Sequence, residues 1–140
     1  MYLGDTCNED VVIRGSSFKG NYRQGMSVIC CERLLVQDCS FEDTRGTNPQ
    51  CGVDFEPNSS QQRLTNISFV NNTFRNNSGC QIAISTSALT SNSTPLSISF
   101  QQTSASMTDG YGIIISIPHT PAAGSYITFL DTDISESSKV

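Results

Sequence analysis

The feature that most constrains this chain is an apolar pattern that returns five times along its 140 residues. Each copy has two apolar residues separated by one residue, and a third apolar residue follows after four more. The copies begin at Val11, Leu34, Ile67, Ile98 and Ile127, so the period lies between the low twenties and the low thirties. A period of this length, with strand-like alternation inside each copy, is typical of a solenoid whose turns stack on one another.

A second apolar pair lies between successive copies, so each turn offers at least two short strands. These pairs begin at Met26, Val53, Ile82 and Ile113. Polar corners such as Asn71-Asn72 interrupt the first pattern, and Asn and Asp tolerate the bent backbone that a recurring corner needs. Short strands joined by polar corners predict a parallel β-helix, and the crossover rule predicts that it is right-handed.

Three other folds fit the sequence less well. An irregular β-sandwich needs hairpin turns, and the one Asp-Gly pair, Asp109-Gly110, falls at a corner. The leucines are too sparse for the dense consensus of a leucine-rich horseshoe. The outward-facing residues do not form the regular Thr-x-Thr ladder that an ice-binding solenoid needs. We therefore predict one all-β domain over residues 1–140, a right-handed parallel β-helix of about four to five coils.

The ends of the predicted coil stack lack caps. No amphipathic helix precedes Val11, and only a polar tail, residues 135–140, follows the last copy. Uncapped coils expose open strand edges. We expect the stack to be a fragment of a longer β-helix, or its ends to be covered by another subunit, as in a homo-oligomer that packs end to end.

Composition and charge exclude some classes of function. The net charge is -5 and the eight Lys and Arg residues are scattered, which argues against a nucleic-acid partner. No segment approaches the ~20 apolar residues that span a bilayer, so we expect no membrane partner. The first ten residues lack the basic and apolar regions of a signal peptide.

Six cysteines leave the redox state open. The repeat places Cys51 over Cys80 on the next coil, about 4.8 Å away, which suits either a disulfide or a stacked pair of thiols. Cys30 is expected in the core and its neighbour Cys31 on the outside. No Cys-x-x-Cys spacing occurs, which removes the common zinc sites.

Five Asn-x-Ser/Thr sequons occur, but such triplets arise easily in a chain rich in Asn and Ser. They begin at Asn58, Asn66, Asn71, Asn76 and Asn92. They would be surface glycosylation sites in a protein secreted by a eukaryote, and corner residues otherwise.

The candidate catalytic residues are Asp54 and Glu56. Alternation along the strand that contains Val53 turns both carboxylates to its outer face, with Cα atoms roughly 6.5 to 7 Å apart. Paired carboxylates can divide acid and base roles, or they can share a hard cation such as calcium. They can equally be two solvated acids on the surface of a solenoid.

Side chains expected near this pair are candidates for substrate binding. The polar connection that contains Asp43 and Arg45 would form a wall of a groove, and Arg23 could bind a carboxylated sugar in bidentate fashion. His119 lies two coils further on, roughly 10 Å along the stack. The candidate substrate-binding residues are Tyr22, Arg23, Gln24, Ser27, Asp43, Arg45 and His119.

Three segments, Asn21 to Ile29, Leu34 to Phe41 and Gly46 to Asn58, carry a resemblance to a known superfamily. They resemble the right-handed parallel β-helix proteins related to pectate lyases, polysaccharide epimerases and phage tailspikes. The resemblance implies an origin in polysaccharide processing. The string from Gly52 to Pro57 keeps the glycine and the acids of an epimerase-like motif but has no histidine, and the Gly-His-Gly element of polygalacturonases is also missing.

Two functions are therefore expected as alternatives. The first is an extracellular or cell-surface enzyme, a lyase, epimerase or glycoside hydrolase, that acts on a polysaccharide containing uronates. The second is a module without catalytic activity that binds glycans or serves as a shaft, as in adhesins and tailspikes.

Overall fold

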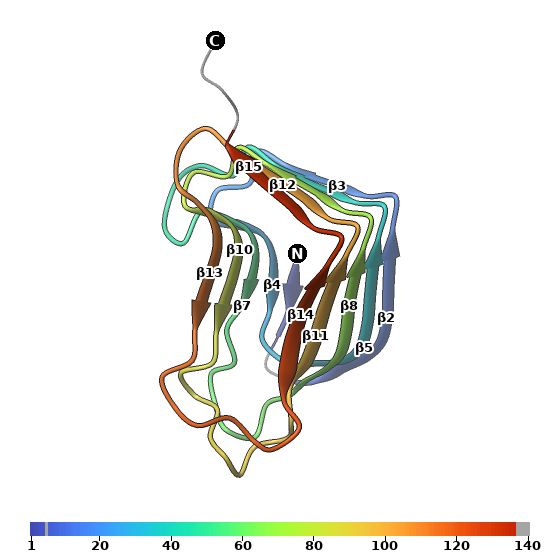
Figure 1. The fold of residues 1–140 in the computed structure, drawn as a ribbon, viewed down its shortest axis with the longest axis vertical. Helices are drawn as coiled ribbons and strands as arrows, with labels where there is room; N and C mark the ends of the chain where they lie inside the picture. The colour runs from blue at the N-terminus through green and yellow to red at the C-terminus, as the bar shows by residue number, and fades with distance from the viewer. Residues whose placement is uncertain (5, 137–140) are drawn as a thin grey trace.

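The computed structural model describes residues 1–4 and 6–136, which form a solenoid of stacked coils (Figure 1). The described residues contain strands and no helix, hence no helix that could cross a membrane. The strands form three parallel sheets of five strands each, here called sheets A, B and C, and each coil contributes one strand to each sheet. The predicted parallel β-helix is confirmed.

The three sheets have the following strands. Sheet A contains β1 (Tyr2–Leu3), β4 (Gln24–Val28), β7 (Cys51–Phe55), β10 (Cys80–Ser85) and β13 (Tyr111–Ser116). Sheet B contains β2 (Asn8–Arg14), β5 (Cys31–Gln37), β8 (Leu64–Val70), β11 (Ser97–Gln101) and β14 (Tyr126–Leu130). Sheet C contains β3 (Ser17–Lys19), β6 (Ser40–Glu42), β9 (Thr73–Arg75), β12 (Ser104–Met107) and β15 (Asp133–Glu136).

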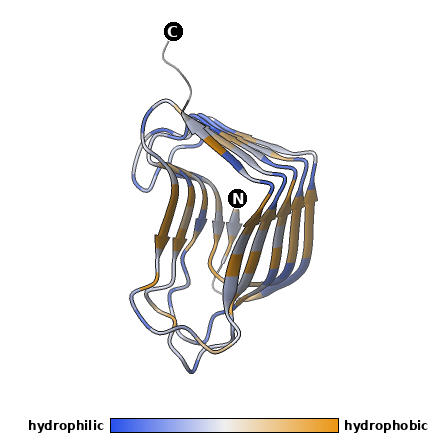
Figure 2. Ribbon diagram, in the orientation of Figure 1, coloured by the Kyte–Doolittle hydropathy of each residue, from blue (hydrophilic) through white to orange (hydrophobic). Residues whose placement is uncertain are grey.

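The apolar repeat sets the register between coils. In sheet A, Met26 pairs with Val53, Val53 with Ile82 and Ile82 with Ile113, as the sequence predicts. Hydrophobic residues accordingly form bands across neighbouring strands, while hydrophilic residues gather in the connections (Figure 2). Sheet C is formed by the third strand of each coil. The sequence predicts at least two strands in each coil, so this third strand is additional.

Aromatic rings stack along the inside of sheet C. The Phe41 ring lies between those of Phe18 and Phe74, with 4.7 Å between centroids on each side and planes tilted by only 6° and 7°. This separation matches the spacing of parallel strands, so identical side chains at one position of successive coils stack face over face. Sheet B has a similar pair in its last two strands, where Phe129 stacks on Phe100 at 4.9 Å, although Phe129 is only half-buried.

The corner between sheets B and C is built from residues with a left-handed backbone. Asp38, Asn71, Gln102 and Asp131 occupy one position in successive coils, with φ between 49° and 55°. Next to Asn71, Asn72 turns inward, where its Oδ1 accepts a hydrogen bond from the Cys39 amide at 2.9 Å and its Nδ2 donates to the Val36 carbonyl at 3.0 Å. The predicted polar corner is confirmed.

The cysteines follow the sequence prediction only in part. Cys51 and Cys80 form a disulfide with Cα atoms 4.7 Å apart, one of the two arrangements expected. The placement of Cys31 on the outside is wrong: its thiol is fully buried and reduced, because Cys31 begins β5 with its side chain toward the core. Cys30 forms a second disulfide, with Cys7, which the sequence analysis missed.

The predicted polar tail begins inside the coil stack. Ser135 and Glu136 belong to β15, which pairs with β12. The rest of the tail, residues 137–140, lies outside the described residues.

Candidate functional site

The site is centred on Asp54, in the middle strand of sheet A. Val53 and Phe55 are fully buried in the core, so alternation turns the intervening Asp54 to the outer face of the sheet. Asp54 lies between Ser27 of β4 and Ala83 of β10 in the parallel register. Although it faces outward, only 4% of Asp54 is exposed.

The Asp54 carboxyl group has lost most of its contact with solvent, and the protein replaces little of that interaction. Its Oδ2 is buried and has no hydrogen-bond partner among the described residues. Loss of solvent, followed by repulsion from Glu56, raises the pKa of Asp54 to about 6, although the positive charge of Arg23 acts in the opposite direction. A carboxyl group with this pKa can give or take a proton near neutral pH.

Glu56 and Arg23 therefore lie close enough to Asp54 for their charges to change its pKa. Glu56 follows the end of β7, is half-buried, and its amide donates to the Val28 carbonyl at 3.3 Å. Alternation along the strand predicts that both acids lie on one face, and the repulsion between them is consistent with this placement.

The connection between β6 and β7 holds the segment that precedes β4. The Arg23 Nε donates to the Asn48 carbonyl at 3.1 Å, and the Thr47 amide donates to the Tyr22 carbonyl at 3.0 Å. Gly46 has a φ of 146°, and a Cβ at this position would lie 2.4 Å from the Tyr22 carbonyl oxygen. The loop thus fixes Arg23 through its backbone, while 73% of Tyr22 stays exposed.

Two other candidates lie in the same sheet. Ser27 is the strand neighbour of Asp54 and is buried. Gln24 pairs with Cys51 at the start of the two strands, and its buried Oε1 has no hydrogen-bond partner among the described residues. The structure therefore gathers Arg23, Gln24 and Ser27 on the strand next to Asp54 or just before it.

The remaining candidates have other surroundings. Asp43 forms an ion pair with Lys19 at 3.6 Å beside sheet C. Arg45 is exposed, and its amide donates to the Asn21 carbonyl at 3.0 Å. His119 is in the connection after β13, where it lines a small hollow together with Thr86 and Ala122.

Two contacts support the site, and the sequence indicated only one of them, the disulfide. Asn48 holds Arg23, and the Cys51–Cys80 disulfide ties the start of β7 to β10 three residues before Asp54. The alignment of Cys51 over Cys80 was a usable signal for the disulfide. No pattern in the sequence marks the carbonyl of Asn48, because every residue has one.

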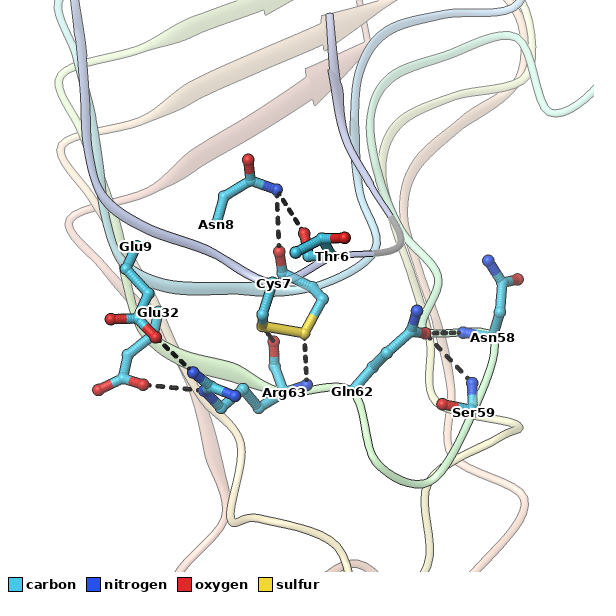
Figure 3. The surroundings of a disulfide bond; sticks show 10 residues. Thr6, Cys7, Asn8, Glu9, Glu32, Asn58, Ser59, Gln62 and Arg63 are labelled. Carbon is cyan, nitrogen blue, oxygen red and sulfur yellow. Dashed lines mark hydrogen bonds and ion pairs between the residues drawn. A yellow bond between two sulfur atoms is a disulfide. The ribbon is translucent and has the colours of Figure 1, made fainter.

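A contrasting group of charges lies on the outer face of sheet B, beside the Cys7–Cys30 disulfide. The Arg63 guanidinium binds Glu9 at 2.6 Å and Glu32 at 2.8 Å, and its amide donates to the Cys30 sulfur at 3.1 Å (Figure 3). These carboxylates have ion-pair partners, whereas none is found for Asp54 within residues 1–4 and 6–136.

No group of three or more His, Cys, Asp and Glu side chains suited to a metal ion is found among residues 1–4 and 6–136. Asp54 and Glu56 are two carboxylates, so a calcium ion shared between them would take its remaining oxygen ligands from water or a substrate.

The fold and the site define a parallel β-helix protein with a buried carboxyl group on the outer face of one sheet. A family model described as "Right handed beta helix region" matches residues 6–95, and the chain belongs to this family, which confirms the predicted handedness. No curated protein and no solved structure matched the chain.

Proposed function

We propose that this protein acts on a polysaccharide that contains uronates, on the outer face of sheet A, with Asp54 as the group that transfers a proton. The observation that carries the proposal is the buried Asp54 Oδ2 without a hydrogen-bond partner. An ionised carboxylate in such a place destabilises a fold, and residues that impose such a cost are concentrated at functional sites.

The surroundings of Asp54 suit an acidic sugar chain. Arg23 is held through its Nε, which leaves the terminal nitrogens of the guanidinium to bind a uronate carboxylate. The exposed ring of Tyr22 offers an apolar surface with a polar tip beside it. Glu56 supplies the second carboxylate for a division of acid and base roles.

The disulfides support a location outside the cell or at its surface. Cys7–Cys30 and Cys51–Cys80 each link neighbouring coils. Disulfides persist in oxidising compartments, where polysaccharides of walls and matrices are also found.

The test is an assay of the purified protein and of Asp54→Asn on alginate, pectate and neutral glycans, with and without calcium. Unsaturated products and new reducing ends are both followed. We expect turnover of a uronate polymer that Asp54→Asn abolishes and that Asp131→Asn, an exposed acid in the last coil, leaves unchanged. Equal turnover by Asp54→Asn would contradict the proposal.

A second function, glycan binding without catalysis, is favoured by the low exposure of Asp54, of which only 4% is accessible. A substrate could reach the carboxyl group only after neighbouring side chains move. This alternative predicts binding of a uronate polymer without cleavage, weakened by Arg23→Gln and unaffected by Asp54→Asn. Calorimetric titration of the three proteins with the polymer distinguishes the two functions.

A further inference from the structure

We propose that Asn58 is a site of N-linked glycosylation, used as the chain passes through a eukaryotic secretory pathway. Asn58, Ser59 and Ser60 form an Asn-x-Ser sequon in the connection between β7 and β8. The proposal concerns this connection and does not depend on the function proposed for sheet A.

Asparagines inside and outside the sequons have different surroundings. Five of the ten asparagines begin a sequon, and of these Asn58, Asn66, Asn71 and Asn92 are exposed. Two asparagines are buried, Asn72 and Asn77, and neither begins a sequon. The asparagines that the core requires are thus separate from those that a transferase could modify.

The connection around Asn58 holds the sequon in place through its backbone. The Gln62 Oε1 accepts hydrogen bonds from the amides of Asn58 and Ser59, at 2.5 and 3.2 Å. Figure 3 shows the Asn58 carboxamide pointing away from Gln62 and from the disulfide. A glycan on its Nδ2 would therefore extend into solvent and displace none of these hydrogen bonds.

The structure also uses the backbone, and not the side chain, of the serine that completes the sequon. The Ser60 carbonyl accepts a hydrogen bond from Ser93 at 2.9 Å, a contact that uses the backbone and not the Ser60 hydroxyl. Asn71, in contrast, donates its Nδ2 to Asp38 at 2.6 Å. Modification of Asn58 therefore breaks none of the hydrogen bonds found among the described residues, whereas modification of Asn71 would break its bond to Asp38.

The compartment is indicated independently by the two disulfides, which require oxidising conditions. The co-substrate is an oligosaccharide linked to a lipid pyrophosphate. The Asn58 Nδ2 forms a bond to the anomeric carbon, the bond from that carbon to the phosphate oxygen breaks, the lipid pyrophosphate leaves, and the amide gives one proton to a base of the transferase.

The experiment uses the protein isolated from the cells that make it. Peptide N-glycosidase in heavy-oxygen water converts a glycosylated asparagine to a labelled aspartate, which mass spectrometry detects in tryptic peptides. The peptide from Gly46 to Arg63 contains Asn58 and also Asn48, an exposed asparagine outside any sequon. We expect label at Asn58 and none at Asn48; an unlabelled Asn58 would overturn the proposal.

Two variants secreted from a eukaryotic culture provide a matched pair. Ser60→Ala removes the sequon, whereas Ser59→Ala keeps it. Neither change removes a hydrogen bond found in the described part of the chain, because Ser59 contacts Gln62 through backbone atoms and Ser60 accepts from the Ser93 hydroxyl through its carbonyl. We expect Ser60→Ala alone to lose the mass of one glycan. Retention of that glycan in Ser60→Ala, or its absence from the parent chain, would contradict the assignment of Asn58.

Discussion

Asn72 and Asp54 are both buried polar residues, but the structure treats them in opposite ways. Asn72 lies inside the corner between sheets B and C, with hydrogen bonds to the backbone of Cys39 and of Val36. Asp54 lies on the outer face of sheet A, with a buried oxygen that has no partner among the described residues.

The difference separates a polar group that the fold needs from one that the fold tolerates. A buried amide that satisfies two backbone groups stabilises the corner, because those groups would otherwise be buried without partners. A carboxylate without a partner only adds a desolvation cost at neutral pH. We therefore assign Asn72 to the fold and Asp54 to function.

The largest expected effect comes from Asn72→Ala, which leaves the Cys39 amide and the Val36 carbonyl unpaired in the core. We expect the free energy of unfolding to fall by about 2 to 4 kcal/mol, measured by urea denaturation. The control is Thr132→Ala, at the equivalent corner of the last coil, where the side chain is only half-buried. We expect a loss of less than about 1 kcal/mol there, because water can replace the hydroxyl. Equal losses would show that Asn72 is not special to the buried corner.

Asp54→Asn is expected to act in the opposite direction. Removing the charge should stabilise the protein at pH 7 by about 1 to 2 kcal/mol, a figure already reduced for partial solvent screening. Urea denaturation at pH 7, with Asp131→Asn as the control, checks the sign. A loss of stability in Asp54→Asn would mean that the carboxylate has a structural partner after all.

The same residue predicts a pH dependence. Burial raises the pKa of Asp54 to about 6 in the folded protein, whereas an unfolded aspartate titrates near 4. The folded state thus binds the proton more tightly, and this contribution to stability is complete below pH 4 and disappears as the pH rises to about 6. The stability gain of Asp54→Asn should therefore vanish at pH 4, and a gain that is constant from pH 4 to pH 7 would refute the linkage.

The smallest expected effect is that of Arg23→Gln. The positive charge of Arg23 lowers the pKa of Asp54, so its removal should raise that pKa and reduce stability at pH 7 by about 0.5 kcal/mol. Arg45→Gln, in the adjoining loop, is the control and should leave the Asp54 titration unchanged. If both variants behave alike, the effect reflects net charge and not the position of Arg23.

The fold could be predicted from the sequence because one signal repeats. The spacing of Val53, Ile82 and Ile113 fixes the register of sheet A, and identical positions stack as expected. The separate strand at each aromatic position was not anticipated, because β3, β6 and β9 have three residues each and show too little alternation to be recognised alone. The Cys7–Cys30 pairing was missed because Cys7 precedes the first copy of the pattern.

The sequence predicts on which face of the sheet Asp54 lies, but not how deeply it is buried. Alternation placed Asp54 on the outer face, but it says nothing of how deeply neighbouring segments cover that face. The connection from Asp43 to Gln50 folds against Tyr22 and Arg23, and it uses only its own backbone atoms in the hydrogen bonds to these two residues. Such contacts leave no pattern in the side chains of the connection. The sequence therefore suggested an exposed acid where the structure has a buried one.

The most direct test of the account is an NMR titration of the Asp54 side-chain carboxyl carbon, assigned by comparison with Asp54→Asn. Burial without a hydrogen-bond partner predicts a pKa of about 6. A pKa near 4, the ordinary value for aspartate, would show that the carboxylate is solvated or paired, and it would remove the reason for placing a functional site on sheet A.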